Sequence, residues 1–260
     1  MESSFTKKLF AVAIVALICF TQQIKAQTTV SKDSLSNEGK NIIKMNLGAL
    51  ILKTYSFEYE RALNSRISFA MDFRIMPKSN IPFKKQVENA VDDQETKQTI
   101  STFRTSNFAI TPEVKFYLGE KGVFRGFYLA PFVSYAKYNG DGPFSYDVTQ
   151  LHYTETLNFK GSLNTYTAGV MVGAQWKLTK LLYFDWWIAG PNYGTSKGSL
   201  VSDKNFIPIE EQYVRQQLAQ FVSDLPLVKA TSTVTSDKAT IDIKGPWAGV
   251  RGGLSLGFRL

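Results

Sequence analysis

His152 is the only histidine in this sequence, and its imidazole could act as a general acid or base. A serine nucleophile would need this imidazole as its general base, and Ser145 and Ser162 both lie nearby in the chain. A lone histidine in a polar stretch is more often an ordinary surface-loop residue than a base. We therefore expect no catalysis, and an enzyme that uses His152 is retained as the lesser alternative.

Metal or cofactor chemistry has even less support in the sequence. Asp92, Asp93 and Glu95 could supply oxygen ligands to a hard cation, but their spacing lacks the pattern of a calcium loop. Glu210 and Glu211 fit the first turn of a helix, where negative charge is favourable. No glycine-rich phosphate loop is present. The sequence therefore predicts no metal site and no cofactor.

The largest group of chemically capable residues consists of charges that alternate with apolar residues along the chain. If the apolar parity faces outward, these charges point into the interior of a closed sheet and must pair there. A salt-bridged plug is the structural interpretation, and a selective pore is the functional one. A small barrel has a narrow lumen filled by side chains, which favours the plug. The set comprises Lys44, Glu58, Glu60, Asp72, Arg74, Glu113, Lys115, Lys177, Asp185, Arg251 and Arg259.

The elements that would position these charges are strands with a period of two. Residues 248–260, AGVRGGLSLGFRL, place apolar residues on one parity, and small residues with two arginines on the other. Their end resembles the closing strand of outer-membrane β-barrels, so Phe258 and Leu260 are the expected signal for the barrel-assembly machinery. Further alternating runs occupy 41–52, 54–62, 66–76, 106–118, 127–138, 164–178 and 181–190.

The connections between these runs alternate in length. Short turns are expected near Asn64, Lys121 and Lys180, whereas residues 77–105, 139–163 and 191–244 are long interruptions. Within these, residues 139–163 could extend the flanking strands as a hairpin, and residues 231–243 could be a further strand extension. Short inner turns and long outer loops are typical of outer-membrane barrels. The last interruption predicts a helix at 208–225, with apolar residues at helical spacing. This helix would cap the barrel mouth or, alternatively, lie in the outer leaflet or bind a partner.

The beginning of the chain predicts export. Lys7 and Lys8 precede an apolar run of about a dozen residues, which suits a signal-peptide core and is too short to span a bilayer. We expect a signal peptide at 1–26, a flexible periplasmic lead-in at 27–40 and the barrel at 41–260. Cys19 is the only cysteine and falls within the leader, so the mature chain would contain no thiol or disulfide.

The formal net charge of +8 is modest and scattered along the chain, which argues against nucleic acid as a partner. A basic rim that faces the phosphates of lipopolysaccharide is compatible with this charge. The expected partners are therefore outer-membrane lipid and lipopolysaccharide, the assembly machinery, and a surface partner at the extracellular loops.

Four segments also resemble a known family, the one catalogued as domain of unknown function 3575. They are NIIKMNLGALILKTYSFEYERALNSRISF, ITPEVKFYLG, YTAGVMVGAQWKLTKLLYFDWWIAGPNYG and KGPWAGVRGGLSLGFRL. The family is similar in build to the small OmpA-like outer-membrane barrels. The resemblance implies fold and location, and it supplies no catalytic or ligand residue.

Together these patterns predict an all-β protein. We expect an antiparallel transmembrane β-barrel of about eight strands, with long extracellular loops, one of which carries a short helix. The expected location is the bacterial outer membrane, and the expected role is structural or in surface interaction. A small-solute channel is the alternative, followed by an outer-membrane lipid-modifying enzyme that uses His152.

Overall fold

The structure is a computed structural model, and it describes residues 39–92, 94–223 and 229–260. Residues 39–260 form one compact unit. The predicted signal peptide at 1–26 and most of the predicted lead-in lie outside the described residues. Among the described residues, no helix has the length and apolar character needed to cross a membrane.

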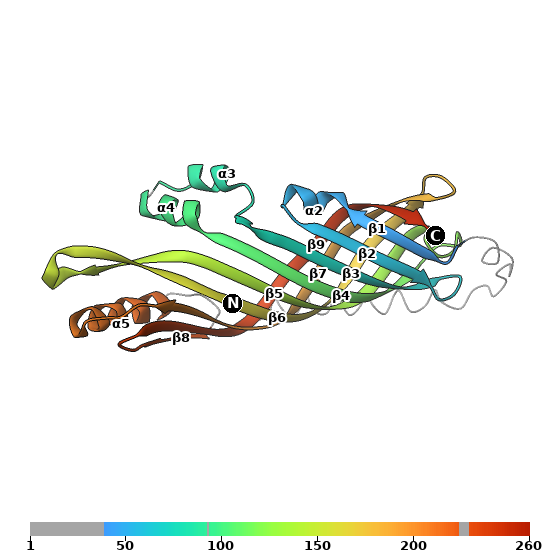
Figure 1. Ribbon diagram of the computed structural model, residues 1–260. Helices are drawn as coiled ribbons and strands as arrows, with labels where there is room; N and C mark the ends of the chain where they lie inside the picture. The colour runs from blue at the N-terminus through green and yellow to red at the C-terminus, as the bar shows by residue number, and fades with distance from the viewer. Residues whose placement is uncertain (1–38, 93, 224–228) are drawn as a thin grey trace, which may run out of the picture. The chain divides into compact units, whose positions relative to one another are not determined.

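Eight antiparallel strands close into a barrel (Figure 1). Each strand pairs with the next one along the ring, and β1 pairs with β9 to close it. The prediction of an antiparallel barrel of about eight strands is therefore confirmed. The ring consists of β1 (Asn41–Asn46), β2 (Tyr55–Ala62), β3 (Ile67–Asn80), β4 (Arg104–Tyr117), β5 (Gly126–Val148), β6 (Tyr153–Lys177), β7 (Leu182–Asp203) and β9 (Lys238–Arg259).

A ninth strand, β8 (Lys229–Val234), pairs only with β9 and lies outside the ring. The helices are α2 (Leu47–Ile51), α3 (Lys84–Asn89), α4 (Gln94–Thr102) and α5 (Pro208–Ser223), and a short 3-10 turn η1 (Thr149–Leu151) joins β5 to β6. The helix predicted at 208–225 is present as α5, and residues 224 and 225 lie outside the described residues. The interruption at 77–105 carries two helices, α3 and α4.

Several strand boundaries differ from the predicted ones. Strand β5 continues to Val148, β6 begins at Tyr153 and β9 begins at Lys238, so much of the two later interruptions is strand. The run at 41–52 ends at Asn46, because the Asn46 side chain accepts a hydrogen bond from the Ala49 backbone N–H and caps α2. The run predicted at 181–190 does not stop before Pro191; it continues as β7 to Asp203. A shift in the β7–β9 register between Trp187 and Gly190 comes just before this proline.

The strand faces have the alternation that the sequence predicts. In β2 every second residue is buried, and the buried set includes Ser56, Glu58 and Glu60. The exposed set includes Tyr55 and Phe57, each about half exposed. The barrel is therefore polar on its inward face, which carries the predicted charges, and apolar on its outward face.

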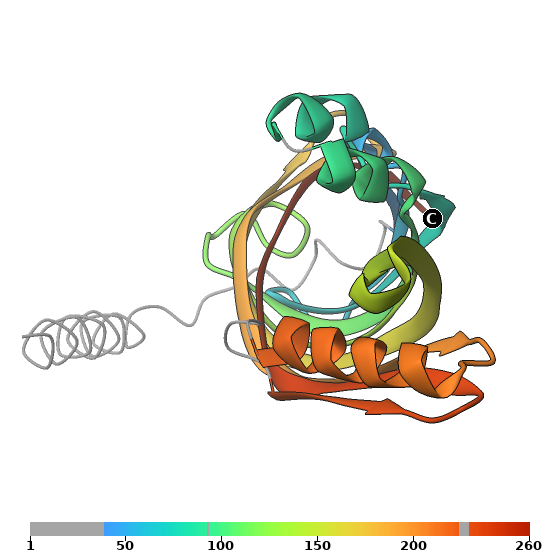
Figure 2. The ribbon, with the colours of Figure 1, turned by 90° about the vertical axis from the view of Figure 1, so that its left-hand side faces the viewer.

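Four ring strands, β5, β6, β7 and β9, continue well beyond the other strands at one end (Figure 1). We call their continuation, with α5 and β8, the extension, and define it as residues 138–163, 198–223 and 229–243. Figure 2 looks onto this end of the molecule. The extension has an apolar core built from Tyr146, Val148, Leu157, Phe159, Phe206, Val214, Leu218, Val234, Ala239 and Ile241.

The extension core lies on the inward face of the strands. Tyr146 of β5 has the same parity as Tyr128, and Leu157 of β6 has the same parity as Gln175; Tyr128 and Gln175 both face the lumen. Helix α5 packs Val214 and Leu218 against this face, and both residues are fully buried. These two residues of the apolar stripe are therefore covered by the strands of the extension, whereas Phe221 of the same helix is 43% exposed.

Candidate functional site

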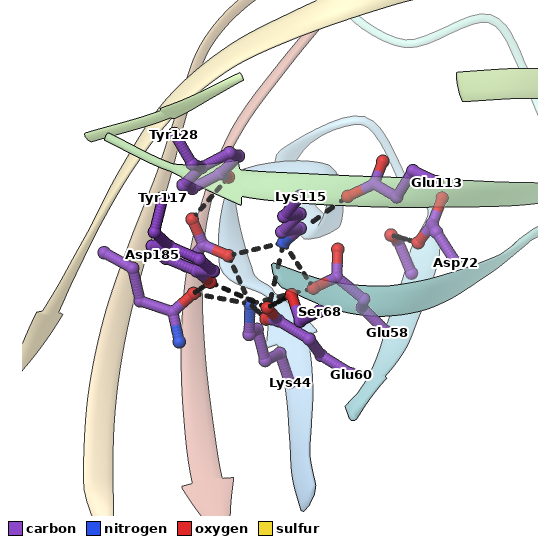
Figure 3. A network of polar contacts seen from close by, with 12 residues as sticks. Lys44, Glu58, Glu60, Ser68, Asp72, Glu113, Lys115, Tyr117, Tyr128 and Asp185 are labelled. Atoms are coloured by element: carbon purple, nitrogen blue, oxygen red, sulfur yellow. Dashed lines mark hydrogen bonds and ion pairs between the residues drawn. The ribbon is translucent and has the colours of Figure 1, made fainter. Parts of the chain in front are cut away.

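The centre of the lumen is filled by two lysines and three carboxylates (Figure 3). Lys44 Nζ lies 2.8 Å from Glu58, 2.5 Å from Asp185 and in contact with Glu60. Lys115 Nζ lies 2.7 Å from Glu58, 3.1 Å from Asp185 and 3.6 Å from Glu60. All five side chains are almost completely buried, so each charge is compensated by its neighbours and not by solvent. We call these five residues the lumen cluster.

Neutral side chains from four strands add hydrogen bonds to the lumen cluster. Tyr117 and Ser68 donate to Glu60, and Tyr128 donates to Asp185 over 2.7 Å. Gln175 accepts a hydrogen bond from Lys44 over 3.0 Å. Sequence reasoning did not select these four residues. Their parity placed them on the inward face, but only their charged neighbours carried a chemical signal.

A second layer lies beside the lumen cluster. Arg251 bridges two carboxylates, at 3.3 Å from Asp72 and 3.1 Å from Glu113. Its guanidinium also stacks over the rings of Phe132 and Trp187, with centroids at 4.7 and 4.9 Å. The Arg251 layer is thus held by ion pairs and by cation–π contacts at once.

Arg259 forms a third layer at the end of β9. It donates to the Tyr183 hydroxyl over 2.6 Å and to the Gly39 carbonyl, and its guanidinium lies over the ring of Phe124. Phe124 comes from the turn between β4 and β5 and is completely buried. This end of the barrel is therefore filled by rings and one guanidinium.

The remaining predicted charges do not join the lumen cluster. Arg74 donates a hydrogen bond to Tyr138 over 3.2 Å, whereas Lys44 is the residue that pairs with Glu58 and Glu60. Lys177 is half-buried near the end of β6. Phe258 and Leu260, the predicted assembly signal, are 49% and 56% exposed on the outward side.

Above the Arg251 layer the lumen opens into a cavity of about 480 Å³, lined in part by Asp72, Arg74, Asn107, Tyr138 and Arg251. The lumen is thus closed by ion pairs at its middle and hollow toward the extension. Three carboxylates of the lumen cluster have oxygens within 4.8 Å of one another, which is close enough to share a cation. The two lysine ammonium groups already lie among them and supply the positive charge.

The extension holds a separate polar group, of which only Glu210 was expected, in the first turn of the helix. Lys204 Nζ lies 2.8 Å from the Tyr146 hydroxyl, 3.2 Å from Glu155 and 3.3 Å from Glu210. Glu210 accepts from Tyr153 over 2.6 Å and from the Ile207 backbone N–H over 3.1 Å. These contacts tie the first turn of α5 to the β5–β6 hairpin.

The pKa values in this group follow from its contacts. Burial raises the pKa of Glu210, but the hydrogen bonds from Tyr153, Ile207 and Lys204 outweigh this effect and hold it below the ordinary value. The hydrogen bond to Glu210 raises the pKa of Tyr153 to about 12. Glu210 therefore stays ionised and Tyr153 stays protonated at neutral pH.

The remaining candidate residues do not gather into a site. His152 lies at the tip of the β5–β6 hairpin with a positive φ of 55°, and its ring makes no hydrogen bond within the described residues. The hydroxyl of Ser145 instead contacts Thr156 over 3.2 Å. Of the acidic run, Asp92 is exposed and Asp93 lies outside the described residues.

Comparison with known proteins gives a family and a structural likeness. The model of a family described as "Protein of unknown function (DUF3575)" matches residues 12–193. The crystal structure of the N-terminal β-barrel domain of Pseudomonas aeruginosa OprF is similar at 8% identity and a TM-score of 0.25, over 86% of this chain and 99% of that one.

No curated protein is significantly similar in sequence to this chain. At so low a TM-score the likeness to OprF carries no weight, and the barrel assignment rests on the strand pairing described above. The family match covers more than half of the residues. The chain belongs to the DUF3575 family.

Proposed function

We propose that this protein is an outer-membrane β-barrel whose lumen is closed by ion pairs, and whose extension acts at the cell surface in a structural or interaction role. No catalysis is part of this proposal. Its main support is that β5, β6, β7 and β9 exchange their apolar and polar faces where they pass from the barrel into the extension.

In the barrel, the outward face of these strands is apolar, and the inward face combines neutral polar and aromatic residues with charges such as Asp185 and Arg251. On β6, for example, Val170 is 47% exposed on the outward face while Gln175 is fully buried. Such an apolar band around the whole ring would be unfavourable in water, since soluble monomers rarely expose large contiguous apolar patches. Hydrocarbon surrounding this band removes that cost.

In the extension, the polarity of the same two faces is reversed. On β6, Thr154 and Thr156 are exposed on the outward face, while Leu157 and Phe159 are buried on the inward face. This is the ordinary arrangement of a water-soluble sheet packed against a helix. A strand that changes from one arrangement to the other supports a boundary between lipid and water at that level.

Lysine and carboxylate pairing supports a closed lumen over the alternative, a small-solute channel. The lumen cluster and the Arg251 layer occupy the cross-section with buried, mutually paired side chains. In planar bilayers we expect the wild-type barrel to conduct far less than an open pore would. Stepwise conductance that persists in the wild type would favour the channel.

The membrane proposal is tested by placing an arginine at two positions on β6 that share the outward face. Both Val170 and Thr156 are exposed, so either substitution would be tolerated in a water-soluble protein. In a membrane barrel Val170→Arg should cost about 2–4 kcal/mol of folding free energy in lipid vesicles, whereas Thr156→Arg should cost almost nothing. Equal effects of the two variants would refute the proposed membrane span.

The location is tested by cell fractionation and by gel mobility with and without boiling. We expect the protein in the outer-membrane fraction, with a folded form whose mobility changes only on boiling. Recovery in the soluble periplasmic fraction without a mobility change would overturn the location. For the enzyme alternative, loss of a lipid-modifying activity in His152→Ala would be the supporting result.

A further inference from the structure

Four lysines lie in one continuous row across five neighbouring strands. Lys137 of β5 pairs with Asn164 of β6, and Asn164 pairs with Lys197 of β7. Lys197 pairs with Lys244 of β9, and Lys244 pairs with Lys229 of β8. Directly paired residues of antiparallel strands point to the same face, so all five side chains lie on the outward face. We call these five residues the lysine row.

Such a row is unfavourable by itself. Neighbouring strands are separated by about 5 Å, and like charges placed directly opposite one another destabilise a sheet. Lys197, Lys244 and Lys229 occupy three successive strands in this way. All four lysines of the row are exposed, and within the described residues none forms an ion pair. Asp242 shares the face of Lys244 but pairs in register with Ser199 and Thr231.

The lysine row lies next to the edge of the apolar band. The adjacent outward row toward the barrel contains Tyr135 and Tyr166, and the row after it contains Tyr193. Tyr166 and Tyr193 are 63% and 67% exposed. Tyrosines with an exposed ring and hydroxyl are typical of the membrane–water interface, where lipid headgroups begin. The ammonium groups therefore lie at headgroup level if the barrel spans a membrane.

We propose that the lysine row is a binding site for the phosphate groups of lipids in the outer leaflet. This inference rests on the proposed function, because it requires the apolar band to lie in the membrane. Phosphate oxygens would neutralise the opposed ammonium groups, and the Asn164 amide can donate a hydrogen bond between them. The acyl chains of the same lipid would lie against the tyrosines and the apolar band below.

The position of the row on the strands favours a lipid over a free phosphate ion. A free phosphate ion would contact the lysines alone. A phosphorylated lipid would contact the lysines with its phosphates and the adjacent apolar surface with its acyl chains. Three of the four lysines also belong to strands that continue into the extension. Bound lipid would thus hold the base of the extension against the membrane surface.

The test uses the full barrel reconstituted in nanodiscs of phosphatidylcholine, titrated with bisphosphorylated lipid A. The test variant replaces all four lysines of the row with glutamine. The matched control replaces Lys40, Lys85, Lys121 and Lys180, four exposed lysines off the row, so both variants lose the same charge. We expect the test variant to bind lipid A about tenfold or more weakly than the wild type, and the control to bind like the wild type.

Two further arms identify the ligand. Lipid A stripped of its phosphates should bind the wild type as weakly as phosphorylated lipid A binds the test variant. Inorganic phosphate at equal concentration should not displace phosphorylated lipid A. Full displacement would show a site for the free ion, and equal binding of the stripped lipid would show that acyl chains alone are recognised; either result overturns the inference.

The outcome separates this inference from the proposed function. Each preparation is first checked for the folded, heat-modifiable form in the nanodisc. If the wild type fails to enter the lipid, the membrane proposal and the inference both fall. If the wild type and the test variant both enter and bind lipid A equally, only the lysine row loses its role.

Discussion

Lys44 Nζ lies 2.5 Å from Asp185 Oδ2, although their strands are not neighbours in the ring. Strand β9 lies between β1 and β7 and pairs with both. The contact is therefore made through the lumen and exists only when the barrel is closed. It makes the lumen cluster a direct probe of closure.

We expect Lys44→Met to destabilise the folded barrel by about 3–5 kcal/mol, because it leaves three buried carboxylates with one lysine. Asp185→Asn should cost less, and the double variant should cost less than the sum of the two single ones. Chemical unfolding in detergent micelles measures all four free energies. Lys180→Met, on an exposed turn, is the control and should stay within about 0.5 kcal/mol of the wild type. Strict additivity would show that the two side chains do not interact.

Gly173 leaves the space that Tyr128 occupies. A Cβ at this position would lie 2.3 Å from the Tyr128 ring, whose hydroxyl donates a hydrogen bond to Asp185. Gly173→Ala should displace the ring and destabilise the barrel by about 1–3 kcal/mol. Gly119→Ala is the matched control, since its nearest neighbour would be 4.0 Å away. The difference in unfolding midpoint between the two variants is the measurement, and no difference would contradict the packing described here.

Leu218 anchors α5 to the extension, where it is fully buried. Leu218→Ala should cost about 2–5 kcal/mol locally and loosen the helix, while the barrel keeps its own ion pairs. Limited proteolysis of the extension, with gel mobility as the readout for the barrel, separates the two effects. Gln216→Ala, at an exposed position of the same helix, is the control. A loss of the heat-modifiable form in Leu218→Ala would show that barrel and extension unfold together.

Docking of α5 should depend on pH through Glu210. Its pKa is lower in the folded protein than in the unfolded chain, because hydrogen bonds from Tyr153, Ile207 and Lys204 favour the ionised form. The stabilisation is therefore fully present above the unfolded pKa and is lost as pH falls through the folded pKa. We expect α5 to become protease-sensitive on acidification below about pH 4.5. Glu210→Gln should remove most of this pH dependence, and an unchanged profile would refute the assignment.

Lys244 has a like charge on each side in the lysine row. In a zwitterionic detergent without anionic lipid, Lys244→Glu should raise the stability of the extension by a few tenths of a kcal/mol to about 1 kcal/mol, since it places a carboxylate between Lys197 and Lys229. Lys238 on the same strand pairs in register with Asp203, so Lys238→Glu would place two carboxylates opposite each other and should be neutral or destabilising. Thermal unfolding of the extension measures both, and a destabilising Lys244→Glu would contradict the repulsion.

The sequence alone was sufficient to predict the antiparallel barrel and the inward face. The reason is local, since the pleat of a strand sends successive side chains to opposite faces whatever the strand pairs with. The parity of Glu58 and Glu60 therefore followed from the eight residues around them. Helix α5 was also predictable from a local pattern, namely apolar residues at helical spacing.

Partners in the lumen could not be predicted, because they depend on register and closure. Arg74 and Lys44 both have the inward parity of Glu58, yet Lys44 pairs with Glu58 while Arg74 contacts Tyr138. The continuation of β7 past Pro191 was also missed. A proline within a run argues against a strand there, because it donates no ladder hydrogen bond. The strand continues because its residues on both sides of Pro191 pair with β9.

The sequence by itself determined which side chains face inward along regular stretches of strand, since this property has a period of two there. In β7 the register shift after Trp187 moves the inward face from odd-numbered to even-numbered residues. Only the tertiary structure decided that Lys44 meets Asp185 and that four lysines fall in one row. Both relationships join residues far apart in the chain, and a shift of one strand by a single residue would abolish them. The periodicity is a property of each segment, whereas the register is a property of the closed ring.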